Sequence, residues 1–104
     1  MVVSGYFKPN YFYHFMYFVY ILQSIKDNTY YIGYTGKEVI ERLKEHNQGK
    51  CKYTKGHIPY KIVKYISVDT KKEAKCREKY YKSLKSAKRV IEIMGSLIFI
   101  IMGF

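Results

Sequence analysis

Cysteine is scarce in this chain of 104 residues. The two cysteines, Cys51 and Cys76, lie far apart and show no repeated spacing, which excludes a disulfide framework and favours a reducing, cytoplasmic setting. Together with His46 and His57 they lack the close ligand pairs that structural zinc sites use. We therefore expect neither a disulfide-stabilised nor a zinc-stabilised domain.

Long hydrophobic runs are also missing. The apolar stretch at 95–104 (GSLIFIIMGF) has half of the roughly 20 residues that a membrane-spanning helix needs. The first fifteen residues lack the charged end, apolar segment and cleavage site of a secretory signal. We treat 1–15 as an extension of unknown order. The tail at 95–104 is expected to form an added strand, a partner contact or a disordered end.

Acidic residues are few, and their distribution is informative. The chain has 19 Lys and Arg against 8 Asp and Glu, a net charge of +11. Residues 50–89 hold 14 basic and 3 acidic residues, so this segment carries the whole excess. Such a concentration predicts a surface for a polyanion. The composition, 48% hydrophobic and 18% aromatic, excludes a disordered tail, and the length allows one domain.

Apolar patterning predicts three strands. Residues 15–22 (FMYFVYIL) are continuously apolar, as expected for a central strand buried on both faces. A turn at 26–28 joins this strand to a second at 29–34, which makes an antiparallel hairpin. The third strand is predicted over 61–68.

Helices are predicted after the second and third strands. TGKE at 35–38 and TKKE at 70–73 match the capping-box pattern, with Thr35 and Thr70 as N-caps. The first helix should run to Asn47 or Gln48, the second to about Leu84, and a third over 86–94. Val39, Ile40 and Leu43 should form the buried face of the first helix. The order β-β-α-β-α-α over 16–94 is typical of an α+β domain with a small three-stranded antiparallel sheet flanked by helices.

Two pairs of side chains are candidates for chemistry. Arg42 and His46 are four residues apart on the first helix and share a face with Glu38. The same spacing is also expected for a solvent-exposed polar stripe with no catalytic role. Tyr20 and Tyr31 lie on adjacent antiparallel strands and are potential cross-strand neighbours. A phenol has a pKa of about 10, so a tyrosine acting as general base needs nearby positive charge.

Glu78 falls on the inward stripe of the second helix, between Ala74 and Tyr81. An inward carboxylate is costly unless it is paired or binds a metal. Pairing with Lys82 or Lys85 is one interpretation. The other is a hard divalent ion held by this carboxylate, water and phosphate oxygens.

These residues, taken in order, resemble the GIY-YIG endonuclease superfamily. The match runs through VYI at 19–21, YIG at 31–33, RLKEHN at 42–47, GKCKYTKGHIPYKIVKY at 49–65 and EAKCREKYYKSLKSAKR at 73–89. It is similar to the short stand-alone bacterial members related to the nuclease domain of the bacterial excision-repair endonuclease. The resemblance implies a cytoplasmic hydrolase that cuts phosphodiester bonds in DNA with one divalent ion, Mg²⁺ or Mn²⁺.

The resemblance also assigns roles to residues. Tyr20 and Tyr31 match the two motif tyrosines, one of which acts as general base, and the choice between them stays open. Arg42 matches the arginine that stabilises phosphate charge, and His46 the histidine that assists or orients the tyrosine. Glu78 matches the metal-binding glutamate, and Gly33 the motif glycine at a position where a side chain would crowd the site.

The chain departs from the family pattern in three places. VYI replaces GIY, Tyr34 stands where some members have lysine, and 83–89 supply no late asparagine.

We expect basic side chains of the segment 50–89 to hold the backbone of the nucleic acid. The expected partner is DNA, including branched and damaged forms, and RNA is the alternative. The residues are Lys50, Lys52, Lys55, Lys75, Arg77, Lys82, Lys85, Lys88 and Arg89.

Two rival functions follow from the same features, and the oligomeric state stays open. The first rival is a non-catalytic nucleic-acid-binding module that kept the fold, since basic charge and aromatic residues alone support it equally. The second is a protein-interaction or membrane-surface adaptor that uses the basic helix and the apolar tail.

Overall fold

The computed structural model describes residues 16–101, with side chains through Gly95, so the predicted extension at 1–15 lies outside the described residues. The elements of this part follow the predicted order: β1 (Tyr17–Ser24), β2 (Tyr30–Thr35), α2 (Val39–Asn47), the short 3₁₀ turn η1 (Lys55–His57), β3 (Tyr60–Val68), α3 (Lys71–Ser83) and α4 (Ala87–Ile101). The predicted α+β class is confirmed.

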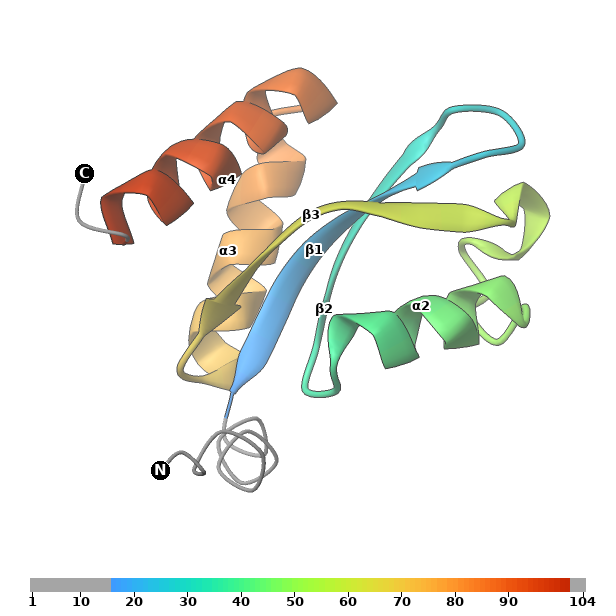
Figure 1. Cartoon of the computed structure of the whole chain (residues 1–104), viewed down its shortest axis with the longest axis horizontal. Helices are drawn as coiled ribbons and strands as arrows, with labels where there is room; N and C mark the ends of the chain where they lie inside the picture. Colours follow the sequence, from blue (N-terminus) through green and yellow to red (C-terminus); the bar gives the residue numbers. More distant parts are fainter. Residues whose placement is uncertain (1–15, 102–104) are drawn as a thin grey trace, which may run out of the picture.

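The three strands form one antiparallel sheet in the order β2-β1-β3 (Figure 1). The central position of β1 explains why the successive residues 18–22 are all buried, as the continuous apolar run predicted. A bulge in the pairing of β1 with β3 sets Ile21 opposite Lys64 and Leu22 opposite Ile62. This extra residue switches the inward side of β3, so Ile62 and Ile66 pack on opposite faces of the sheet.

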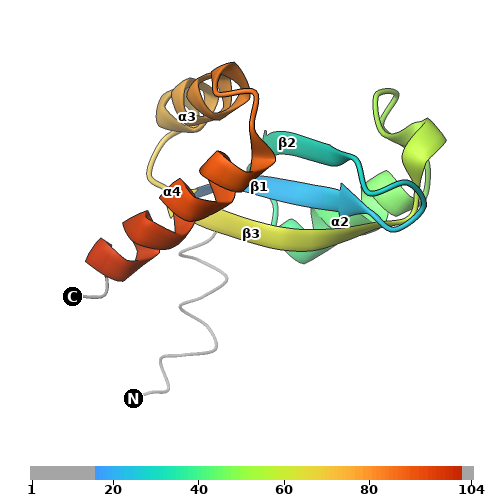
Figure 2. The same cartoon turned by 90° about the horizontal axis from the view of Figure 1, so that it is seen from above.

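Helices cover both faces of the sheet (Figure 2). On one face, α3 and α4 bury the larger core cluster with Val19 and Ile21 of β1. On the other face, α2 packs through Val39 against Tyr20 and Leu22. Because successive side chains of a strand point to opposite faces, Tyr20 is directed to the α2 side.

The start of α2 differs from the first predicted capping box. Thr35 is the last residue of β2, and its hydroxyl accepts a hydrogen bond from the backbone N–H two residues later, at 3.0 Å. The helix begins at Val39 with Glu38 as N-cap and no side-chain cap bond. The threonine was wrongly assigned because the same hydroxyl also closes a local turn. Ile40, predicted to be buried, is 50% exposed.

The N-cap predicted at Thr70 is confirmed. The Thr70 hydroxyl accepts a hydrogen bond from the Glu73 backbone N–H at 3.1 Å and caps α3. Ala74 and Tyr81 are fully buried, as the predicted inward stripe requires.

The last helix is longer than predicted. α4 begins at Ala87 and continues to Ile101, so the first part of the apolar tail is helical rather than an added strand. Within residues 16–101, no helix is long and apolar enough to cross a bilayer.

Side chains anchor the basic loop at 48–59 to the sheet. The Asn47 amide donates to the Tyr60 carbonyl at 3.1 Å and accepts from the Tyr60 N–H at 2.7 Å. The Ser24 hydroxyl donates to the His57 carbonyl at 2.6 Å, and the His57 ring pairs with Asp27 at 2.5 Å. The loop is therefore tied to the start of β3 and to the hairpin.

Candidate active site

The two motif tyrosines are diagonal neighbours on the α2 face of the sheet. Tyr20 pairs with Gly33 and Tyr31 pairs with Leu22, so the two tyrosines are offset by two residues along the ladder. Their ring centroids are 6.4 Å apart. Tyr20 is 1% exposed, whereas Tyr31 on the edge strand is only partly buried.

His46 connects Tyr20 to the basic loop. Its Nε2 lies 2.9 Å from the Tyr20 hydroxyl, and its Nδ1 lies 2.8 Å from the Thr54 hydroxyl. Thr54 also donates to the Cys51 carbonyl at 3.4 Å. With that hydrogen committed, Thr54 accepts from Nδ1–H, and Nε2 is left to accept the proton of Tyr20. The solvated-stripe interpretation is therefore wrong for His46, which is completely buried.

Burial sets the protonation states of this pair. The pKa of His46 is lowered to about 4, mainly because the ring is buried, and the positive charge of Arg42 lowers it further. Burial also raises the pKa of Tyr20, although Arg42 opposes the increase through a hydrogen bond and its charge. At neutral pH both side chains are therefore uncharged, and the phenol donates to an unprotonated imidazole nitrogen.

Arg42 lies between the phenol and an acidic partner. Its Nη1 donates to Glu45 at 2.8 Å, and Glu45 also pairs with Lys37. Lys37 first, and then Arg42, lower the pKa of Glu45 to about 2. Burial alone would lower the pKa of Arg42, but hydrogen bonds to Glu45 and Tyr20 raise it. The guanidinium is thus fixed in its charged form beside Tyr20.

Gly33 leaves space that the two phenols need. A Cβ at this position would lie 2.7 Å from the Tyr20 hydroxyl oxygen and 2.9 Å from Cε2 of Tyr31. Contacts this short force atoms to move, and buried Tyr20 is held by His46. The geometry at Gly33 therefore agrees with the crowding expected at the motif glycine.

Glu78 approaches the phenols from α3. Burial is the largest cause that raises the pKa of both Tyr20 and Tyr31, and the Glu78 carboxylate adds to it. The carboxylate is 21% exposed, and Lys82 lies 3.5 Å from it. The Lys82 ammonium is also 5.8 Å from the centroid of the Tyr31 ring. The expected lysine pairing is therefore present, at the edge of the sheet where the Tyr31 ring lies.

The donor set around Glu78 fits a hard divalent cation. Its carboxylate oxygens are ligands that Mg²⁺ and Mn²⁺ accept, and its partial exposure leaves the other positions to water and phosphate oxygens. Among the described residues, no group of three His, Cys, Asp or Glu side chains could hold a metal together. An ion held by Glu78 would therefore take its remaining ligands from outside these side chains.

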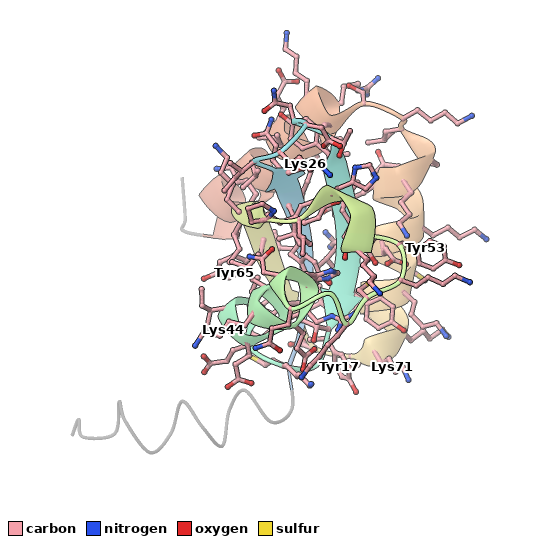
Figure 3. All side chains as sticks on the ribbon, turned by 90° about the vertical axis from the view of Figure 1, so that its right-hand side faces the viewer. Tyr17, Lys26, Lys44, Tyr53, Tyr65 and Lys71 are labelled. Carbon is pink, nitrogen blue, oxygen red and sulfur yellow. The ribbon has the colours of Figure 1, made fainter. Side chains whose placement is uncertain are left out.

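The basic residues proposed for the DNA backbone come from two parts of the chain. Lys50, Lys52 and Lys55 lie on the loop that follows α2, and the others lie on α3, on the α3–α4 corner and at the start of α4. Arg77 is partly used within α3, because it pairs with Glu73 at 3.3 Å. Figure 3 shows Tyr53, from the same loop, on the side of the molecule where Lys71 of α3 also lies.

Two contributors were missed from the sequence. Thr54 is fully buried and holds Nδ1 of His46. Burial acts to raise the pKa of the Cys51 thiol, but hydrogen bonds within the loop lower it overall. Both residues lie in the basic loop, which has no helical or strand periodicity from which their positions at the site could be predicted.

Fold and site together define a small α+β domain in which a tyrosine of the central strand meets a histidine and an arginine of α2 on one face of the sheet. A family model for the GIY-YIG catalytic domain matches residues 16–90. UPF0213 protein YazA of Bacillus subtilis is 41% identical over 81 residues, covering 77% of this chain and 77% of that protein. UPF0213 protein LMOf2365_0181 of Listeria monocytogenes is 44% identical over 68 residues, covering 64% and 74%.

The solution NMR structure of UPF0213 protein BH0048 from Bacillus halodurans shares 37% identity and a TM-score of 0.41, covering 79% of this chain and 84% of that one. The chain belongs to the GIY-YIG family, in the group of small stand-alone bacterial UPF0213 proteins. The predicted resemblance is confirmed. The family consists typically of endonucleases, so the domain indicates nuclease activity and nucleic-acid binding.

Proposed function

We propose that this protein is a divalent-metal-dependent endonuclease that hydrolyses phosphodiester bonds in DNA. The single observation that carries the proposal is the 2.9 Å contact between the Tyr20 hydroxyl and His46 Nε2, with Arg42 beside the same phenol. This arrangement gives a water-activating group a route for its proton and places positive charge next to it.

Tyr20 is proposed as the general base. It takes a proton from the attacking water while its own proton passes to Nε2 of His46, which the low pKa of that ring keeps unprotonated at neutral pH. The hydroxide oxygen bonds to phosphorus as the bond to the leaving oxygen breaks. Thr54 keeps Nδ1 protonated, so the acceptor nitrogen faces Tyr20.

Arg42 and Glu78 complete the proposed site. The guanidinium neutralises charge that develops on the phosphate oxygens. A divalent ion on the Glu78 carboxylate, when bound, stabilises the same charge and supports displacement of the leaving oxygen. Tyr31 packs at 5.1 Å from His46, measured between ring centroids, and forms the outer wall of the site.

The Glu78→Gln variant tests the proposal in a plasmid-nicking assay with Mg²⁺ or Mn²⁺. Removal of the charge should abolish metal-stimulated nicking and leave DNA affinity nearly unchanged, since the amide keeps the size of the side chain. Glu92→Gln is the matched control, because Glu92 is an exposed glutamate of α4 and should retain activity.

Equal nicking by Glu78→Gln and the wild type would remove Glu78 from the mechanism. DNA binding by the wild type without cleavage, with either metal and across duplex, branched and single-stranded substrates, would identify a binding module of the same fold.

A further inference from the structure

A pocket of about 480 Å³ opens next to the proposed phosphate site. Tyr30 and Tyr31 of β2 line one side, and Lys82, Lys85 and Ser86 line the other, at the end of α3. Tyr53 approaches from the basic loop. The volume falls within the roughly 300–1,000 Å³ of small-molecule sites.

The lining combines aromatic faces with positive charge. Tyr53 is 80% exposed and Tyr30 is 44% exposed, so both present apolar ring surface to solvent at the pocket. Lys82 and Lys85 supply ammonium groups at the opposite wall. Aromatic faces that stack on bases, next to cations that bind phosphate, are the features by which proteins hold unpaired nucleotides.

The pocket is continuous with the proposed active site. Tyr31 belongs to both, since its ring lies 5.1 Å from that of His46 and also lines the pocket. Lys82 likewise pairs with Glu78 and lines the pocket. A nucleotide in the pocket would therefore be next to the phosphate that Arg42 and Glu78 hold.

We propose that this pocket binds the base of an unpaired nucleotide adjacent to the scissile phosphate, with Tyr30 and Tyr53 as stacking surfaces and Lys85 on the flanking phosphate. The inference rests on the proposed function, because the neighbouring phosphate is the one that the nuclease would cut. It defines the substrate class as DNA with an unpaired base, and a base inside a continuous duplex could not enter.

The backbone at Lys85 supports an active use of its side chain. Lys85 has a φ of 52°, in the left-handed region that glycine or asparagine adopts more easily at the end of a helix. The chain therefore has a lysine where the backbone favours other residues, and this lysine lines the pocket.

The test measures binding without cleavage, by fluorescence anisotropy in EDTA. Three DNA duplexes are compared: one with a single bulged nucleotide, one with an abasic bulge of the same charge, and one fully paired. The wild type should bind the base-bearing bulge at least about fivefold more tightly than the abasic bulge, the lower end of the effect of one stacked base.

Tyr53→Leu and Tyr30→Leu should reduce this ratio towards one. Tyr65→Leu is the matched control, since Tyr65 is 48% exposed but lies on β3, at the opposite edge of the sheet, and should retain the wild-type ratio. Figure 3 shows Tyr65 and Tyr53 on opposite sides of the molecule. Circular dichroism of each variant checks the fold.

A wild-type ratio near one, or an equal ratio in the Tyr53 and Tyr65 variants, would overturn the pocket assignment and leave the nuclease proposal intact. The opposite result is tighter binding of the base-bearing bulge in EDTA, together with no nicking at any metal concentration. The pocket would then stand and the nuclease proposal would fail.

Discussion

Tyr20 is a buried phenol whose hydroxyl has specific neighbours on several sides. His46 forms a hydrogen bond with it, Arg42 supplies positive charge beside it, and the missing side chain of Gly33 leaves the remaining space. Each of these residues lies close to the same atom, the hydroxyl oxygen of Tyr20. At the scale of single residues, small changes in volume or charge should therefore have large effects.

Gly33→Ala should reduce nicking strongly and destabilise the fold by about 1–3 kcal/mol, because the added methyl group overlaps the Tyr20 hydroxyl. Gly56→Ala is the control, since a Cβ at Gly56 meets no atom within 4 Å. Nicking rates and urea unfolding of both variants measure the effect. Wild-type activity and stability in Gly33→Ala would show that the site tolerates a side chain there.

His46 should make stability depend on pH. Its pKa falls from 6.5 to about 4 on folding, so the unfolded chain binds the proton more readily. The resulting stability is fully present above pH 6.5 and is lost as the pH falls towards 4. Between about pH 7 and 5 we expect a loss of about 2 kcal/mol in the free energy of unfolding.

Urea unfolding at several pH values measures this slope, with His46→Gln as the comparison. The variant should show a flatter profile between about pH 7 and 5, because glutamine does not titrate. Glu45, whose pKa is lowered by Lys37 and Arg42, acts at lower pH and is present in both proteins. Parallel profiles for the two proteins would contradict the assignment.

At the scale of elements, two threonines with the same local motif behave differently. Thr70 caps α3, whereas Thr35 is buried at the end of β2 and bonds to the backbone of the following turn. The difference is tertiary, because β1 pairs with β2 as far as Thr35 and holds that residue in an extended conformation. A four-residue motif cannot contain this information.

Thr70→Ala should destabilise the protein by about 1 kcal/mol, because the backbone N–H of Glu73 loses its acceptor. For a domain of this size the midpoint of thermal unfolding should fall by about 4–8 °C. Thr70→Ser keeps the hydroxyl and should stay near the wild type. Equal melting of the alanine and serine variants would mean that the cap does not support α3.

At the scale of the whole molecule, the concentrated positive charge should dominate DNA binding. The basic side chains come from the loop after α2 and from the α3–α4 region, and two of them, Lys82 and Lys85, line the pocket beside the proposed site. Contacts of this kind release counterions and do not read sequence. We therefore expect salt-sensitive binding with weak sequence preference.

Lys85→Gln should lower the slope of log affinity against log salt concentration by about 0.9, the value for one phosphate contact. Lys44→Gln is the control, because Lys44 is an exposed lysine on α2 and lies outside the basic segment. Titrations of a duplex with a bulged nucleotide at several salt concentrations provide the slopes. An unchanged slope for Lys85→Gln would place this side chain away from the DNA backbone.

Local patterns in the sequence predicted the strands, the order of elements and the family. The apolar run of β1, the hairpin turn and the cap at Thr70 each depend on residues close together in the chain. The exposure of Ile40 and the burial of His46 could not be predicted in this way. Both depend on how α2 is rotated against the sheet, which packing with β1 and β3 decides.

By itself, the sequence determined where charge accumulates, which segments form strands and helices, and which family the chain belongs to, since these are properties of composition and short-range order. Only the tertiary structure decided that Thr54 holds His46, that Lys82 joins Glu78 to Tyr31, and that a pocket opens beside them. These contacts join residues from different elements, and their distances exist only once both faces of the sheet are packed.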